Sequence, residues 1–311
     1  MAGDEFRQSS GFAGRLVRWM KEYARFATLP SGSESERVGK LYDNVVGTAN
    51  LIGEESLFLN LGYWKNRPTT IDDACADLAR LVATEANLTS GDVVLDIGCG
   101  FGDQDFLWLK EFGTAQITGV NVAVRQIEIA TGRAAALGLA ESVRFVRGAA
   151  SDLPVADASA NKVIALESAF HFPSREDFFI EAFRVLKPGG RLVVADIIPR
   201  RRRDVSGPDR SMPFGGAYAR SVFSQTGRNR MYGTEYQEAL RQAGFRDVKE
   251  LSIRDDVFAP LGQFLRTSYG RSRLKQMNPV GRIWLSRLAM KAWSPWVDYV
   301  VMVADKPAAS G

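Results

Sequence analysis

The chain has 311 residues, of which 45% are hydrophobic and 24% charged, ordinary proportions for a folded globular protein with one large core. Its 40 Lys and Arg against 36 Asp and Glu give a formal charge of +4, too small by itself to indicate a nucleic-acid partner. Two cysteines exclude a disulfide framework or a zinc cluster, and neither a run of about 18 apolar residues nor a secretory signal occurs. We therefore expect a cytoplasmic protein without a metal site.

The first part of the chain, up to about residue 89, is rich in aromatic residues and helical in its periodicity. Apolar side chains recur there at helical spacing with Arg and Lys among them, a pattern that predicts a basic amphipathic helix near the N-terminus. The apolar members are Phe12, Leu16, Trp19, Met20, Tyr23 and Phe26. We predict that this N-terminal part forms a helical cap segment.

The middle of the chain alternates short β-rich runs with stretches of helical periodicity, which predicts a Rossmann-like, doubly wound α/β fold. One intervening helix is expected to be capped by Ser174 and stopped by Pro188-Gly189-Gly190. A later helix over 234–243 leads to two further strands, so we expect a mostly parallel sheet of about seven strands. The expected strands are 93–97, 117–120, 143–146, 163–166, 192–195, 248–253 and 297–304.

The tail after the fifth expected strand departs from this alternation. Pro199 and the run Arg200 to Arg203 begin a predicted lid, and the stretch from Val257 to Val297 has seven Lys or Arg and no acidic residue. Aromatic and aliphatic residues are interleaved with these cations, which predicts a second amphipathic cap. The predicted segments are an N-terminal cap over 1–77, a core over 78–255 with a lid near 200–233, a basic cap insertion over 256–296, and a last strand and tail over 297–311.

A glycine-rich turn directly after the first strand is the strongest local signal. Its sequence, Asp96-Ile97-Gly98-Cys99-Gly100-Phe101-Gly102, allows a cofactor to approach the backbone closely at the carboxyl end of a strand. A dinucleotide dehydrogenase would need a third glycine where Asp103 stands, and no Gly-Lys-Ser/Thr follows for a phosphate-binding loop. Both of these nucleotide-binding classes are disfavoured.

This turn resembles the first motif of class I S-adenosylmethionine-dependent methyltransferases, of the small-molecule type that acts in natural-product O- and C-methylation. The segments 151–154 and 184–192 also resemble that family. The resemblance implies that Gly98 and Gly100 border the amino-acid part of the cofactor, with Asp96 near its ammonium group. Asn121 stands where the family usually has an acidic residue for the ribose hydroxyls. The other expected cofactor-binding residues are Val122, Gln126, Ala150 and Glu167.

The segment after the fourth strand, Glu167-Ser168-Ala169-Phe170-His171-Phe172, carries the candidate catalytic groups. Its only imidazole, and the only one in the chain, suits removal of a proton from a hydroxyl acceptor. The segment is similar to the Glu-Ser-x-His-His stretch of rebeccamycin-type sugar O-methyltransferases, which implies that His171 and Asp196 assist proton removal. We predict O-methylation of a small apolar or lipid-like metabolite.

Two other functions remain open at this point. Glu167 matches the glutamate of isoprenoid-diphosphate C-methyltransferases, where it acts as the base in methylation of an alkene. Aromatic faces would then stabilise a cation, and the candidate substrate-binding residues are Tyr63, Trp64, Phe170 and Phe172. The second alternative is a protein that binds the cofactor without methyl transfer, such as a cyclase or an interaction partner.

The basic amphipathic segments on either side of the α/β core indicate which partners the protein has. Such stretches receive an apolar or anionic small molecule, or lie on an anionic bilayer, so we predict a small-molecule or lipid substrate with peripheral membrane contact as an open alternative. No RNA-binding module or base-edge motif accompanies the cations, and we expect no nucleic-acid partner.

Overall fold

The computed structural model describes residues 20, 38–39, 51–205, 217 and 229–309. The basic helix predicted around residues 12–26 lies outside this part of the chain except for Met20, and so does most of the lid predicted near 200–233. Within the described residues, no helix is both long and apolar enough to cross a membrane.

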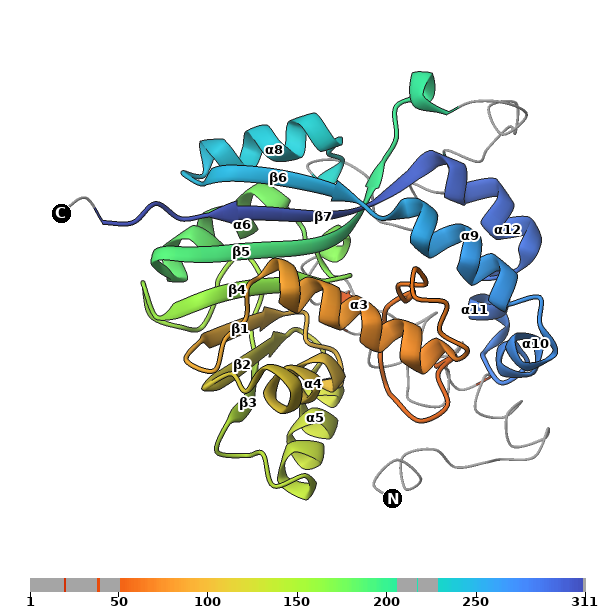
Figure 1. The fold of residues 1–311 in the computed structure, drawn as a ribbon, viewed down its shortest axis with the longest axis horizontal. Helices are drawn as coiled ribbons and strands as arrows, with labels where there is room; N and C mark the ends of the chain where they lie inside the picture. Colours follow the sequence, from red (N-terminus) through yellow and green to blue (C-terminus); the bar gives the residue numbers. More distant parts are fainter. Residues whose placement is uncertain (1–19, 21–37, 40–50, 206–216, 218–228, 310–311) are drawn as a thin grey trace.

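A seven-stranded sheet forms the centre of the molecule, in the order β3-β2-β1-β4-β5-β7-β6 (Figure 1). All neighbouring strands pair in parallel except β7, which runs antiparallel to both β5 and β6. The mostly parallel, doubly wound sheet predicted from the sequence is confirmed. The strands are β1 Val93–Ile97, β2 Gln116–Asn121, β3 Val143–Arg147, β4 Ala160–Leu166, β5 Leu186–Pro199, β6 Arg246–Ser252 and β7 Val297–Asp305.

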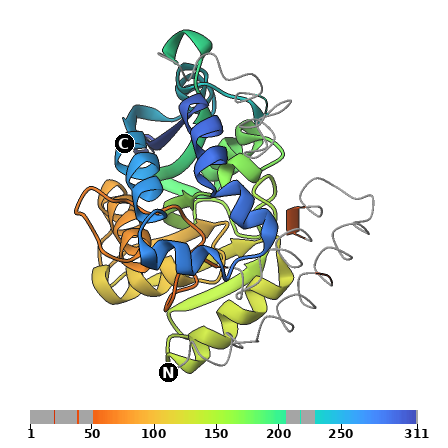
Figure 2. The same cartoon turned by 90° about the vertical axis from the view of Figure 1, so that its right-hand side faces the viewer.

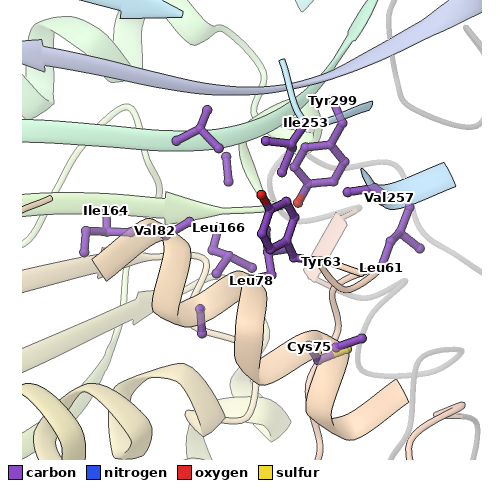
Figure 3. Packing of buried hydrophobic residues seen from close by; sticks show 14 of the residues in the cluster. Leu61, Tyr63, Cys75, Leu78, Val82, Ile164, Leu166, Ile253, Val257 and Tyr299 are labelled. Atoms are coloured by element: carbon purple, nitrogen blue, oxygen red, sulfur yellow. The ribbon is translucent and has the colours of Figure 1, made fainter. Parts of the chain in front are cut away.

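Helices cover both faces of the sheet, because successive side chains of each buried strand point to opposite faces. On β4, Ile164 and Leu166 join the core beneath α3, whereas Val163 and Ala165 join the core beneath α6 and α8. Figure 3 shows part of the first core, in which Leu78 and Val82 of α3 point toward β4. The covering helices are α3 Ile71–Glu85, α4 Asp103–Phe112, α5 Val124–Ala136, α6 Arg175–Val185 and α8 Gly233–Gln242.

The predicted start of α6 is confirmed, because the Ser174 side chain accepts a hydrogen bond from the Asp177 amide. The predicted stop at Pro188 is wrong. The helix ends at Val185, and the Pro-Gly-Gly segment already lies in β5. Leu186 pairs there with Ala160 of β4, and the Gly189 amide bonds to the Lys306 carbonyl, so sheet pairing ends the helix before proline is reached.

The segment boundaries differ in detail from those expected. Helix α3 spans the boundary placed after residue 77 and packs on β4 and β5, so it belongs with the sheet. Residues 51–70, expected to be helical, contain no helix. The predicted cap insertion between the last two strands consists of four short helices on the right of Figure 1, which lie in front of the sheet in Figure 2. They are α9 Arg254–Phe264, α10 Ser268–Leu274, α11 Pro279–Trp284 and α12 Arg287–Trp293.

Candidate active site

A pocket opens where β1, β2 and β4 end, the edge at which parallel α/β sheets bind ligands. Most of the residues predicted to bind cofactor or substrate, or to act in catalysis, line it. They are Gly98, Gly100, Asn121, Val122, Gln126, Ala150, Glu167, His171 and Phe172.

The glycine-rich turn forms one wall of the pocket. Gly98 has a φ of +87°, and a Cβ there would lie 2.3 Å from the Ser168 Cβ, so a side chain is excluded. The Ser168 hydroxyl in turn donates to the Ile97 carbonyl (2.6 Å) and ties the end of β4 to the end of β1. A Cβ on Gly100 would approach Leu59 to 3.1 Å. The turn therefore offers bare backbone, a surface that suits close approach of a cofactor.

Asp96 lies behind the pocket wall rather than in it. Its carboxylate is fully buried and accepts from the Gln104 side chain (2.8 Å), and Gln104, which also donates to the Cys99 carbonyl, is the residue that lines the pocket. Burial raises the pKa of Asp96 to about 7, and burial beside Asp96 also raises the pKa of Asp105. Sequence reasoning missed Gln104, although it follows the predicted turn by two residues.

Asn121 and Gln126 form the polar end of the cofactor region. The Asn121 amide donates to Gln126 Oε1 (2.8 Å), while its oxygen accepts from the Ala123 backbone (3.2 Å). Gln126 Nε2 is buried and has no hydrogen-bond partner among the described residues. A buried amide donor without a partner is costly, and a ribose hydroxyl of the cofactor would satisfy it.

Glu167 follows β4 in a left-handed conformation, with a φ of +49° that is uncommon for a residue with a side chain. Its Oε1 accepts from the Leu61 amide (2.7 Å) and from the Tyr299 hydroxyl (2.8 Å). Burial raises the pKa of Glu167 to about 7, although both hydrogen bonds oppose the shift. The carboxyl is thus held in place at the pocket and is about half protonated near neutral pH.

His171 ends a short 3₁₀ turn, Ala169–His171, whose last amide donates to the Ser168 carbonyl. Burial, and then the charge of Arg175, lower its pKa to about 4, so the imidazole is neutral at physiological pH. Phe170 packs against it with ring centroids 4.2 Å apart. The pocket therefore contains an unprotonated imidazole able to accept a proton.

Asp196 was predicted to orient His171, but its carboxylate is engaged elsewhere. Both oxygens pair with the Arg175 guanidinium (2.7 and 3.1 Å), and both side chains are fully buried. The Tyr236 hydroxyl and the Ile197 amide add further bonds, and Asp196 does not line the pocket. Asp196 is engaged in this way because Arg175, the first residue of α6, brings a full charge into the interior, and a buried charge must be paired.

The same guanidinium supports the turn that carries His171. Arg175 also donates to the Asn229 carbonyl, and the Asn229 amide donates to the Phe170 carbonyl (2.8 Å). Among the described residues, the hydrogen bonds of Asp196 connect it to the His171 turn indirectly, through Arg175 and Asn229. Sequence reasoning missed both intermediates, since neither belongs to a motif.

Three of the four aromatics predicted to contact substrate are core residues. Tyr63 and Trp64 are buried and do not line the pocket; Trp64 packs on Phe264 of α9 with ring centroids 5.0 Å apart. Phe170 is buried as well, which leaves Phe172 as the member at the pocket. The remaining apolar lining includes Leu57 and Leu59, in a segment whose sequence has no clear periodicity.

The chain is similar in sequence to known methyltransferases. Residues 95–194 match a family model described as a methyltransferase domain. The erythromycin 3''-O-methyltransferase of Saccharopolyspora erythraea is 37% identical over 264 residues, which cover 82% of this chain and 85% of that protein.

Solved structures show the same fold. The [4+2]-cyclase SpnF superposes with a TM-score of 0.69 at 24% identity, covering 90% of this chain and 99% of the other. A geranyl diphosphate C-methyltransferase from Streptomyces coelicolor A3(2) also gives 0.69, at 18% identity, covering 89% and 99%. From its sequence relatives and its site, the chain belongs to the class I methyltransferases, enzymes that use S-adenosylmethionine as cofactor.

Proposed function

We propose that this enzyme transfers the methyl group of S-adenosylmethionine to a hydroxyl oxygen of an apolar secondary metabolite. The observation that carries the proposal is the imidazole of His171, which lines the same pocket as the glycine-rich turn. The likeness to a 3''-O-methyltransferase named for erythromycin supports oxygen as the acceptor atom.

The pocket residues fit the cofactor. Gly98 and Gly100 would lie along its amino-acid part. Gln104, whose side chain donates to Asp96, would lie between that carboxylate and the ammonium group of the cofactor. The unpartnered amide of Gln126 would bind the ribose. Bound S-adenosylmethionine supplies a methyl group already activated by its sulfonium. The work left to the protein is to align the acceptor with the methyl carbon and to remove the acceptor's proton.

His171 lines the pocket where that proton is released, although burial lowers the pKa of its imidazole to about 4 and so weakens it as a base. The acceptor proton passes to the imidazole as the new carbon–oxygen bond forms and the carbon–sulfur bond breaks, which leaves neutral product and a protonated histidine. General-base assistance of this kind contributes roughly 10²- to 10⁴-fold to rate. Asp196 acts indirectly, through the bonds from Arg175 to Asn229 and from Asn229 to the His171 turn.

C-methylation of an alkene with Glu167 as base is the second candidate, because Glu167 also lines the pocket and has a pKa of about 7. Stabilisation of a carbocation would need aromatic faces around the reacting carbon. Of the four aromatics predicted for this role, only Phe172 lines the pocket, where Phe101 of the glycine-rich turn is the other aromatic residue, and this small aromatic set favours the oxygen acceptor.

The apolar lining by Leu57, Leu59 and Phe172 supports an apolar or lipid-like substrate. Such a molecule partitions into bilayers, so the proposal includes peripheral membrane contact of a cytoplasmic enzyme through its basic cap. The thiols of Cys75 and Cys99 are buried and form no disulfide, which suits a reducing compartment.

The test combines binding with product analysis. Calorimetry with S-adenosylmethionine and its demethylated product establishes cofactor binding, and hydroxylated lipids, polyketides, macrolides and prenyl diphosphates are then screened by mass spectrometry. His171→Gln should lower the rate of O-methylation roughly 10²- to 10⁴-fold with cofactor affinity unchanged. Glu167→Gln is the matched variant and should retain most of that activity; loss with Glu167→Gln but not with His171→Gln would replace this proposal by C-methylation.

A further inference from the structure

Two large aliphatic side chains project from the cap on consecutive short helices. Ile283 near the end of α11 is 64% exposed, and Leu288 at the start of α12 is 74% exposed. They lie on either side of the turn that joins these helices. Their side chains offer apolar surface that an apolar partner would bury.

The turn that carries these residues is held firmly from below. Leu285, Met290 and Trp293 are buried against the core, and the rings of Trp284 and Trp293 stack 5.8 Å apart. The Ser286 side chain accepts from the Ala289 amide and caps α12. Because the inward positions are already filled, the two aliphatic side chains remain on the outside.

Exposed cations flank the aliphatic pair in sequence, since Arg282 precedes Ile283 and Arg287 precedes Leu288. No acidic residue occurs between positions 257 and 297, and six Lys or Arg side chains of this stretch are exposed. These are Arg266, Arg271, Lys275, Arg282, Arg287 and Lys291. The four helices occupy one end of the molecule (Figure 1), so a single planar partner could meet several of these cations together.

We propose that the outer surface of α10, α11 and α12 binds an anionic phospholipid membrane. Ile283 and Leu288 enter the boundary between headgroups and acyl chains, and the surrounding cations contact the phosphates. The aliphatic pair favours a bilayer over a nucleic acid, since bases would be bound by stacking on exposed aromatic rings. The inference rests on the proposed function only in one respect, because membrane binding would serve to deliver an apolar methyl acceptor. Binding of the protein to the membrane does not itself depend on methyl transfer.

Vesicle co-sedimentation tests the proposal. The full-length protein should bind vesicles of phosphatidylcholine mixed with phosphatidylglycerol and bind phosphatidylcholine alone weakly. Replacing both Ile283 and Leu288 by Ser should weaken binding about tenfold or more. Arg287→Gln with Lys291→Gln should weaken it about fivefold for each cation removed, with the difference reduced at high salt.

Matched variants elsewhere provide the controls. Ile180→Ser removes an aliphatic side chain that is 59% exposed on α6, and Lys110→Gln with Lys249→Gln removes two exposed cations outside the cap. Neither should change vesicle binding. The proposal would be overturned if the control variants weakened vesicle binding as much as the cap variants do. It would also be overturned if replacement of Ile283 and Leu288 converted a dimer to a monomer without changing vesicle affinity. Cofactor affinity, measured by calorimetry on the same variants, separates this result from any failure of the proposed reaction.

Discussion

Replacement of Glu167 by Gln tests the electrostatics of the pocket without knowledge of the acceptor. Gln is isosteric and keeps an oxygen to accept from the Leu61 amide and the Tyr299 hydroxyl. It removes the ionisable group whose pKa burial raises from 4.5 to about 7. The substitution should therefore change how stability depends on pH more than it changes the fold.

The direction of this pH dependence follows from the number of protons that the folded and the unfolded chain bind. Between pH 4.5 and about 7, folded Glu167 keeps a proton that the unfolded chain has released, so this residue makes the wild type less stable as pH rises. This contribution of Glu167 to the free energy of unfolding is fully present below pH 4.5 and is lost as the pH rises through about 7. At about 1.4 kcal/mol per pH unit, the loss is at most about 3 kcal/mol, and less where water in the pocket solvates the carboxylate.

Urea denaturation at a series of pH values measures the effect. We expect the free energy of unfolding of Glu167→Gln, relative to wild type, to rise by up to about 3 kcal/mol between about pH 4 and about pH 8. Other titrating groups, including Asp96, are common to both proteins, so their contributions cancel in the difference between the two free energies of unfolding. Glu181→Gln is the contrasting control, because Arg184 lowers the pKa of Glu181 and its loss should destabilise the protein near neutral pH. A difference between Glu167→Gln and wild type that is flat with pH would refute the buried, protonated carboxyl.

Asp196→Ala should leave the buried Arg175 guanidinium without its carboxylate and lower the free energy of unfolding by about 3–5 kcal/mol, as measured by urea denaturation. A variant as stable as the wild type would contradict the ion pair. Gly98→Ala would place a methyl carbon 2.3 Å from the Ser168 Cβ at a φ of +87°. We expect it to weaken S-adenosylmethionine binding about tenfold or more by calorimetry, since the turn must move away from the cofactor; unchanged affinity would show that the cofactor does not approach this turn.

Local patterns predicted the elements of this fold well. The β-rich runs and the Ser174 cap depend on residues near one another in sequence, so the strands and the start of α6 could be predicted. The end of α6 could not, because pairing of Leu186 with β4 competes with the helix before Pro188 is reached. The cap helices were predicted as a basic amphipathic stretch, but the two aliphatic residues that remain exposed in it, Ile283 and Leu288, could not be.

By itself, the sequence determined the chemistry class through the resemblance of its glycine-rich turn to the first motif of class I methyltransferases. It also located the site, since that turn and the residues after β4 follow parallel strands whose carboxyl ends meet at one edge. This rule correctly brought Gly98, Gln126 and His171 to one pocket. Only the tertiary structure decided which side chains face that pocket. Asp196 ends a strand at the same edge, yet Arg175, a partner 21 positions away, neutralises it in the interior. Side-chain direction and partner choice depend on packing between distant segments, and no local pattern records them.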